Sequence, residues 1–299
     1  MGKDVHKNHK EVPEMGGIAV IFGSLFALLI YIALDTFYFS NSNSITLLLA
    51  ALATILIATM IGMTDDMLGW RLGLKQREKL ALTFLVPIPM MVVNAGTSVM
   101  KFPFLGLTEL GLLYPLLFLP GGVVGATNGF NMLAGYNGLE AGMGIIILSA
   151  LGYLAWQVGA GNAVVIAVCL VAALIALLYY NRYPSRVFPG DVLTYPIGAS
   201  IAVVAVLADL ERFALMLFLP YYFELVLKAR GRFRPDWTGE VLEDGSLNNR
   251  EKWYSVPHVA ISVLRRAKGK AYEYEVVAVI LAFEVAVALL TIYTFRLPV

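Results

Sequence analysis

The sequence predicts an all-α polytopic membrane protein, a single bundle of about nine transmembrane helices. Hydrophobic residues make up 59% of the 299 residues and charged residues only 14%, whereas a soluble domain carries about 25% charged residues. The apolar residues gather in long runs and do not alternate as the strands of a membrane barrel do. We therefore expect one membrane domain over residues 1–299, with residues 229–274 as a cytoplasmic loop within it.

The apolar runs are each long enough to span a bilayer, which takes roughly 17 to 25 helical residues. The polar connectors between them are mostly short, which favours a single bundle. The first run is too long for a secretory signal and lacks a small-residue cleavage site. The predicted spans are 16–38, 45–63, 79–95, 110–127, 138–158, 162–180, 190–208, 212–228 and 275–295.

The distribution of Lys and Arg predicts the orientation. With residues at helix ends included, 19 of the 22 Lys and Arg fall on the N-terminus and on connectors of one face. The other face carries Lys101, Arg212 and Arg296. The positive-inside rule makes the first face cytoplasmic. The net charge of +1 indicates no particular partner and we expect no nucleic acid, while the single Cys169 excludes a disulfide framework.

The segment 127–140 is the most unusual polar stretch, because it holds three asparagines, three glycines and Glu140 between two apolar runs. Polar side chains at membrane depth are costly and usually mark a site. Asn128 and Asn131 are three residues apart, so on a helix they share a face. Helix capping and glycine-mediated packing are the alternative explanation. We interpret the segment as the floor of a polar ligand site.

Asp65 and Asp66 lie at the exit of the second run and form the next cluster. Adjacent carboxylates repel each other unless a cation or a proton lies between them. Mg²⁺ often binds one or two carboxylates together with substrate phosphates. The alternative is a solvated start of a loop. Lys75, Arg77 and Lys79 follow, as anion-binding residues or as determinants of topology.

Two further clusters belong to the same predicted face. Phe188 and Gly190-Asp191 enter the seventh run, where the aspartate is a helix cap, a metal ligand or both. In the segment 228–234 arginines alternate with other residues, a pattern that binds phosphates or anionic lipid. Together the clusters predict metal-assisted chemistry on a phosphorylated substrate. The sequence has no P-loop, no Gly-x-Ser-x-Gly and no His-Glu-x-x-His.

In chain order, these motifs resemble the polyprenyl-phosphate N-acetylhexosamine-1-phosphate transferases. The resemblance covers 13–17 (Pro-Glu-Met-Gly-Gly), Asp65-Asp66, 128–140 and Gly190-Asp191. Residues 137–142 and the arginine-rich segment 228–235 are similar to the eukaryotic and archaeal branch that uses dolichyl phosphate and UDP-GlcNAc. Bacterial relatives that use the MurNAc-pentapeptide nucleotide carry a histidine-rich motif in the last cytoplasmic loop, where this chain has only His258.

The resemblance implies a reaction in which dolichyl phosphate attacks the β-phosphorus of UDP-GlcNAc. The products are GlcNAc-pyrophosphoryl-dolichol and UMP, in the first step of lipid-linked oligosaccharide assembly for N-glycosylation. It also implies Mg²⁺, with Mn²⁺ as an alternative, inhibition by tunicamycin, and a cytoplasmic active-site face. A homodimer is an open alternative, and the sequence leaves the oligomeric state undecided. The membrane is the plasma membrane of an archaeon or bacterium, or the endoplasmic reticulum of a eukaryote.

The resemblance also implies roles for particular residues. Because a phosphomonoester is mostly dianionic near pH 7, Asp65 and Asp66 are expected to organise metal and lysine rather than to accept a proton. A covalent aspartyl-phosphate is the rival mechanism. The other implied roles are metal ligation by Asn131 and Asp191, pyrophosphate contact by Lys75, clamping by Arg230 and Arg232, and substrate binding by Glu14, Asn128, Gly135, Asn137, Glu140 and Phe188.

The chain departs from the family pattern in three places. The family has ten spans, and we expect the helix before the Pro-x-x-Gly-Gly stretch to be missing here, through truncation, a misplaced start codon or a real variation. Gly69 and Gly231 stand where relatives carry polar residues. A bacterial-type transferase acting on undecaprenyl phosphate remains the nearest alternative. A secondary transporter is less favoured, because its polar site would lie near the bilayer centre and its halves would repeat. Glu284 lies inside the last run without an assigned role.

Overall fold

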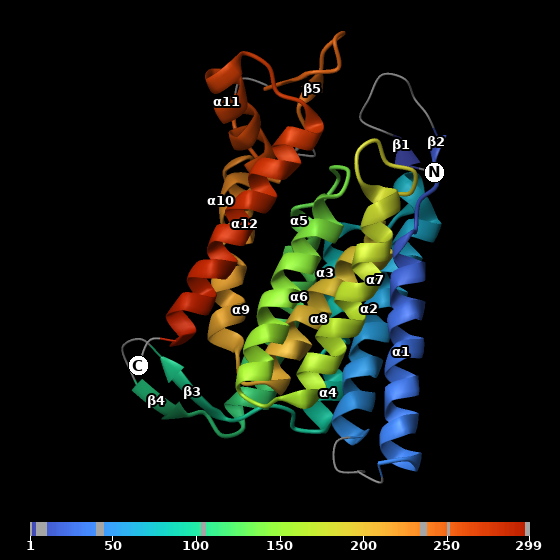
Figure 1. The fold of residues 1–299 in the computed structure, drawn as a ribbon, viewed down its shortest axis with the longest axis vertical. Coiled ribbons are helices and arrows are strands. Elements are labelled where there is room, and N and C mark those ends of the chain that lie inside the picture. The colour runs from blue at the N-terminus through green and yellow to red at the C-terminus, as the bar shows by residue number, and fades with distance from the viewer. Residues whose placement is uncertain are drawn as a thin grey trace.

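The computed structural model describes residues 2–3, 11–39, 45–102, 106–233, 238–249 and 252–296, and it is mainly helical (Figure 1). Among these described residues, five helices are long and apolar enough to cross a membrane, which confirms the prediction of an all-α polytopic membrane protein. They are α1 (Gly17–Phe37), α2 (Ile45–Leu72), α6 (Leu139–Gln157), α7 (Gly161–Asn181) and α12 (Glu273–Arg296). A sixth apolar helix, α8 (Asp191–Leu207), is shorter.

Three of the predicted spans are not continuous helices. Proline lacks the amide hydrogen and clashes with the preceding turn, so each of these runs is interrupted or changes its helical type near a proline. The number of membrane crossings therefore stays a prediction. The pieces are α3 (Gln76–Thr83) and α4 (Ile88–Val92), the π-helix η1 (Tyr114–Phe118) and α5 (Leu119–Met132), and α9 (Glu211–Leu217) and α10 (Leu219–Arg230).

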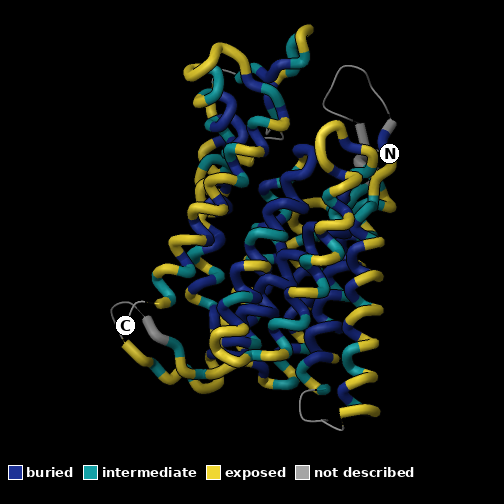
Figure 2. Tube along the Cα trace, in the orientation of Figure 1, coloured by how far each residue is buried: buried dark blue, intermediate teal, exposed yellow. Residues whose placement is uncertain are grey.

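Helix α8 is the central element, and every residue from Val192 to Val206 is buried. It packs against α2 and α5, and buried residues concentrate around it (Figure 2). A Cβ atom at Gly62 of α2 would lie 2.2 Å from the Asp191 carbonyl oxygen, and one at Gly198 of α8 would lie 2.4 Å from the Ala126 carbonyl oxygen. Only glycine permits such close approach, so these positions fix α8 between α2 and α5.

The C-terminal helices α9, α10, α11 (Val256–Lys268) and α12 form a group at one side of the bundle (Figure 1). Within 229–274 the described residues form helix α11 and an antiparallel pair, β5 (Glu240–Val241) with β6 (Leu247–Asn248). The other antiparallel pairs are β1 (Gly2–Lys3) with β2 (Glu11–Val12), and β3 (Val99–Phe102) with β4 (Gly106–Glu109). Arg234 and Pro235 of the predicted basic segment lie outside the described residues.

Buried Glu224 of α10 connects this helix to the start of α11. Its carboxylate accepts hydrogen bonds from the Ser255 hydroxyl at 2.8 Å and from the Val256 amide at 2.7 Å. It also pairs with the Lys228 ammonium at 3.2 Å. A buried carboxylate is stable only when such partners compensate its lost hydration. Glu224 therefore fixes the start of α11 against the end of α10.

Candidate active site

The stretch before α1 and the stretch before α8 lie side by side. The Phe188 amide donates to the Pro13 carbonyl at 2.8 Å, and the Gly16 amide donates to the Phe188 carbonyl at 2.9 Å. Glu14 and Phe188, which are far apart in the sequence, are thus brought to one end of the bundle. Gly190 has φ +75°, and a Cβ atom there would lie 2.4 Å from Asp66 Oδ2. The motifs at the start of α1, the end of α2 and the start of α8 therefore meet.

Asp66 caps the N-terminus of α8. Its Oδ1 accepts from the Asp191 amide and its Oδ2 from the Val192 amide, each at 2.9 Å. Free amide hydrogens and the helix dipole both favour a carboxylate at this place. Both oxygens of Asp66 are engaged, so the residue positions the backbone of Asp191.

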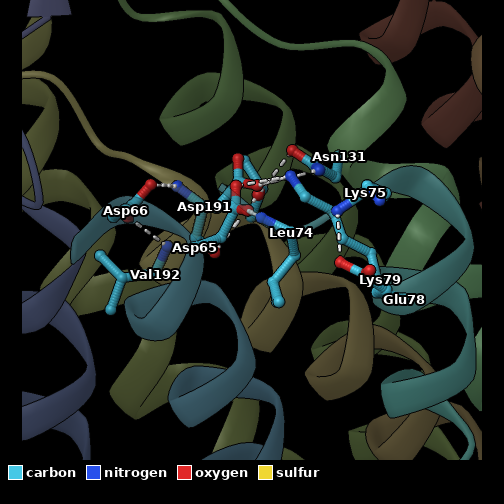
Figure 3. A network of polar contacts seen from close by, with 10 residues as sticks. Asp65, Asp66, Leu74, Lys75, Glu78, Lys79, Asn131, Asp191 and Val192 are labelled. Atoms are coloured by element: carbon cyan, nitrogen blue, oxygen red, sulfur yellow. Dashed lines mark hydrogen bonds and ion pairs between the residues drawn. The ribbon is translucent and has the colours of Figure 1, made fainter. Parts of the chain in front are cut away.

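Asp65 and Asp191 converge on one point, and the ammonium of Lys79 from α3 occupies it (Figure 3). Lys79 Nζ lies 2.5 Å from Asp65 Oδ2 and 2.8 Å from Asp191 Oδ2. Asn131 of α5 faces the same carboxylate, with its Nδ2 3.4 Å from Asp191 Oδ2. Its Oδ1 accepts from the Thr194 hydroxyl at 2.9 Å. Four helices thus contribute to one cluster, which we call the carboxylate–lysine cluster (Asp65, Lys79, Asn131 and Asp191).

The charge on Lys79 is strongly held. Burial disfavours the charged ammonium, but the carboxylates of Asp191 and Asp65 outweigh burial and raise the pKa of Lys79 above its ordinary value of 10.5. The sequence-based choice for the pyrophosphate contact was Lys75, which is exposed at the start of α3. The Lys75 amide donates to Glu78 Oε2 at 2.9 Å. Its role stays a prediction, and the lysine that reaches the aspartates is Lys79.

Gly69 ends the regular part of α2 and lets the chain turn back. Its φ of +66° and ψ of 175° suit glycine, because a side chain would strain this conformation. The Gly73 amide then donates to the Gly69 carbonyl at 2.7 Å, and the Leu74 amide donates to Asp65 Oδ1 at 2.8 Å. Gly69 therefore has a backbone role in placing Asp65. The sequence shows only that a glycine replaces the polar residue of relatives at this position, and it does not predict this role.

Three acceptors from three helices fix the loop between α5 and α6. Each accepts a hydrogen bond from a backbone amide, and each is at least nine-tenths buried. Two of these acceptors, Glu273 and Asn181, were not singled out in the sequence, because nothing local marks a partner so distant in the chain. The bonds are Gly135 to Glu140 Oε1 at 2.6 Å, Asn137 to Glu273 Oε1 at 2.7 Å, and Gly138 to Asn181 Oδ1 at 3.0 Å.

Among the described residues, the Asn137 side chain in this loop has a polar group without a partner. The Asn137 side chain is 5% exposed, and its Nδ2 has no hydrogen-bond partner among the described residues. A buried donor without a partner costs free energy unless a ligand or water satisfies it. Glu140 holds the loop through Oε1, while its Oε2 is likewise buried without a partner among the described residues. Asn137 and Glu140 therefore both leave a polar atom for a ligand or water, and both assigned roles stay predictions.

An apolar groove of about 580 Å³ runs beside the cluster. Asn128 and Met132 line it near the cluster, and Tyr114 and Glu211 line its other end. Asn128 Nδ2 donates to the Thr83 hydroxyl at 2.9 Å, which ties α5 to α3. The groove lies between η1, α5, α8, α9 and α10, so it passes along the bundle toward the opposite end. Its apolar lining suits a hydrocarbon chain.

The predicted arginine clamp lies at the end of α10. Arg230 and Arg232 are both exposed, and Arg232 has φ +54°. Lys228, on the same segment, donates to the Met132 carbonyl at the end of α5. The segment is therefore held against the helix that carries Asn131. The clamping roles of the two arginines stay predictions.

The fold and the cluster define a class: an integral, multi-pass membrane protein that gathers carboxylates, amides and a lysine at one end of its bundle. Residues 48–209 match the family model described as glycosyl transferase family 4. The chain belongs to this family, in agreement with the resemblance drawn from its motifs.

Two relatives carry the same kind of name. A protein of Saccharolobus solfataricus, provisionally named UDP-N-acetylglucosamine–dolichyl-phosphate N-acetylglucosaminephosphotransferase, is 32% identical over 98% of this chain and 87% of its own length. The enzyme of that name from Dictyostelium discoideum is 29% identical over 71% of this chain and 59% of its own. A phospho-N-acetylmuramoyl-pentapeptide-transferase of Symbiobacterium thermophilum is 31% identical over 74% of this chain and 67% of its own.

Proposed function

We propose that this chain transfers N-acetylglucosamine-1-phosphate from UDP-GlcNAc to dolichyl phosphate and releases UMP. The observation that carries the proposal is the convergence of Asp65 and Asp191 on one cation position beside the end of an apolar groove. A pyrophosphate and a lipid phosphate need such a combination of charge and hydrocarbon binding. The names of the relatives from Saccharolobus and Dictyostelium support the same substrates.

The residues present fit a divalent cation. Two carboxylate oxygens already face a single positive centre at 2.5 and 2.8 Å, and Mg²⁺ takes one or two carboxylates and completes its shell with water and phosphate oxygens. Asp65, Asn131 and Asp191 would hold Mg²⁺ or Mn²⁺. When bound, the ion would neutralise charge on the pyrophosphate.

The chemistry is a displacement at phosphorus. An oxygen of the lipid phosphate forms a bond to the β-phosphorus, the bond from that phosphorus to the bridging oxygen breaks, and UMP leaves with the electron pair. The attacking group is already mostly dianionic near pH 7 and needs little help from a base. The main barrier is the approach of two anions, so positive charge from Lys79, and from Arg230 and Arg232, should supply the largest catalytic effect.

The remaining contacts divide between donor and acceptor. On the donor side we assign Asn137, Phe188 and Glu14 to the nucleotide, because the loop and the start of α1 hold them at the same end as the cluster. On the acceptor side the groove would take the first part of the polyprenyl chain, with its phosphate at the Asn128 end. We place this end of the bundle in the cytoplasm because it carries most of the Lys and Arg.

The test is UMP release by the purified protein with UDP-GlcNAc, dolichyl phosphate and Mg²⁺. We expect release that depends on the lipid and stops with EDTA. Undecaprenyl phosphate and the MurNAc-pentapeptide nucleotide serve as competing substrates in parallel reactions. A clear preference for either one would assign the chain to the bacterial type of reaction. No UMP from any combination would overturn the proposal.

A further inference from the structure

We propose that a second anion site, separate from the carboxylate–lysine cluster, binds the phosphate of an anionic phospholipid headgroup at the end of α7. A cavity of about 220 Å³ lies there, lined by Tyr179, Arg182, Tyr183, Pro184 and Arg186. A phosphate group with its first headgroup atoms is of comparable size. The proposal does not depend on the transferase reaction, because none of these residues belongs to the proposed catalytic or nucleotide contacts.

The lining of this pocket has the chemistry of a phosphate site. It presents two guanidinium groups and no carboxylate. Arg182 lies over the Tyr179 ring, with its central carbon 5.2 Å from the ring centre. Within the described part of the chain, no ion pair engages either arginine. Paired guanidinium donors match the oxygens of a phosphate, whereas a lone basic residue would serve only as a topology signal.

The fold fixes the backbone of this pocket. The Arg186 amide donates to the Tyr180 carbonyl at 2.8 Å, so the chain folds back onto the end of α7. Buried Asn181 donates through Nδ2 to the Val187 carbonyl at 3.0 Å, and the Ser185 hydroxyl donates to the same carbonyl at 2.8 Å. Both arginines therefore start from an ordered backbone, which lowers the entropy lost when a ligand binds.

The position of the pocket favours a lipid over a soluble anion. Helix α7 is one of the five helices able to span the membrane, and the pocket lies at its last turn. Tyr179 and Tyr180 are exposed there, and tyrosines concentrate at the membrane–water interface. Basic pockets at this level on the cytoplasmic side bind anionic headgroups. Inorganic phosphate and UMP share the same chemistry, so the experiment must separate these sources.

The test measures retention of phosphatidylglycerol by the full chain in detergent, using native mass spectrometry. We expect the unmodified chain to retain one phosphatidylglycerol tightly. The double variant Arg182→Gln/Arg186→Gln should bind this lipid at least about tenfold more weakly. The matched control is Lys252→Gln/Arg266→Gln, which removes the same charge from two exposed residues elsewhere on the same predicted face. It should retain the lipid like the unmodified chain. Equal loss in both double variants would reduce the effect to net charge and overturn the proposal.

Three further arms identify the ligand. Phosphatidylcholine should not be retained, because its choline cation neutralises the phosphate and leaves the headgroup without net charge. Millimolar inorganic phosphate or UMP should not displace phosphatidylglycerol. Displacement by either soluble anion would overturn the lipid assignment. If the double variant fails to fold, Arg186→Gln alone serves, since this residue is exposed and lies outside the helix. Phosphatidylglycerol should then raise the thermal unfolding midpoint less in this variant than in the unmodified chain, and an equal rise would contradict the proposal.

Discussion

The two ends of α8 each lie beside a pair of carboxylates, but the carboxylates face different partners. At the beginning of the helix, Asp65 and Asp191 share the ammonium of Lys79. Just beyond its other end, Asp209 and Glu211 accept hydrogen bonds from neutral donors. The Thr97 amide and hydroxyl donate to Asp209 at 3.1 and 2.9 Å, and the Tyr114 hydroxyl donates to Glu211 at 2.5 Å.

The comparison shows that acidic residues near a helix end do not by themselves make a catalytic site. Asp209 and Glu211 each accept hydrogen bonds from a different residue, Thr97 and Tyr114, and so tie loops to the bundle. Asp65 and Asp191 are aimed at a single point, and a third carboxylate, Asp66, holds the backbone of the second. Convergence on one positive centre is what makes the first pair suitable for phosphate chemistry.

The largest expected effect comes from the same substitution made at the two ends. Asp191→Asn removes a charge from the cluster and should lower the rate of UMP release by roughly 10²- to 10³-fold. Asp209→Asn should change it by less than about twofold, because Asn tolerates the left-handed backbone at this position, φ +53°, and keeps the acceptor oxygen. The measurement is the initial rate with saturating lipid. Similar losses in the two variants would break the distinction.

The next effect separates Lys79 of α3 from Lys75, which precedes this helix. Lys79→Gln should lower the rate by roughly 10²-fold, and Lys75→Gln by less, because only Lys79 contacts both aspartates. The raised pKa keeps Lys79 charged at every pH below its ordinary value of 10.5. The ratio of unmodified to Lys79→Gln rates should therefore stay constant from about pH 6 to 9. A ratio that shrinks toward pH 9 would mean that Lys79 loses its proton in this range.

A smaller effect tests whether α12 positions the loop between α5 and α6 for the proposed nucleotide contact. Glu273→Ala should raise KM for UDP-GlcNAc about tenfold with little change in kcat, because the Asn137 amide loses its acceptor. Glu273→Gln keeps an acceptor oxygen and should recover much of the affinity. Glu275→Ala, two residues further along α12, is the control. A fall in kcat with unchanged KM would show that Glu273 acts on something other than nucleotide binding.

The smallest effect concerns stability at the far end. Tyr114→Phe should lower the free energy of unfolding by about 1 kcal/mol, because Glu211 loses its neutral donor. Tyr221→Phe is a matched control, since the Tyr221 hydroxyl is buried and has no partner among the described residues. It should leave the stability unchanged or raise it. Thermal unfolding in detergent would measure both, and a larger loss for Tyr221→Phe would contradict the hydrogen-bond assignment.

Much of the fold and of the candidate site could be predicted because the evidence is local. Long apolar runs are sufficient to predict a helical membrane protein, since the bilayer sets the length of a spanning helix. Asp65, Asn131 and Asp191 stood out because each is a polar residue at the edge of such a run. The interrupted helices were not predicted because the spans were assigned from hydropathy alone, although the prolines within these runs are a helix-breaking signal in the sequence.

The sequence by itself determined the membrane class, the order of the motifs and the family. Tertiary structure decided which side chains meet: Lys79 and not Lys75 reaches the aspartates, Asp66 caps α8, and Glu273 and Asn181 hold the loop between α5 and α6. The physical reason is that the direction of each side chain depends on how its helix is packed. Each residue turns a helical side chain by about 100°, and its partners come from distant segments, so only the packed bundle fixes where it points.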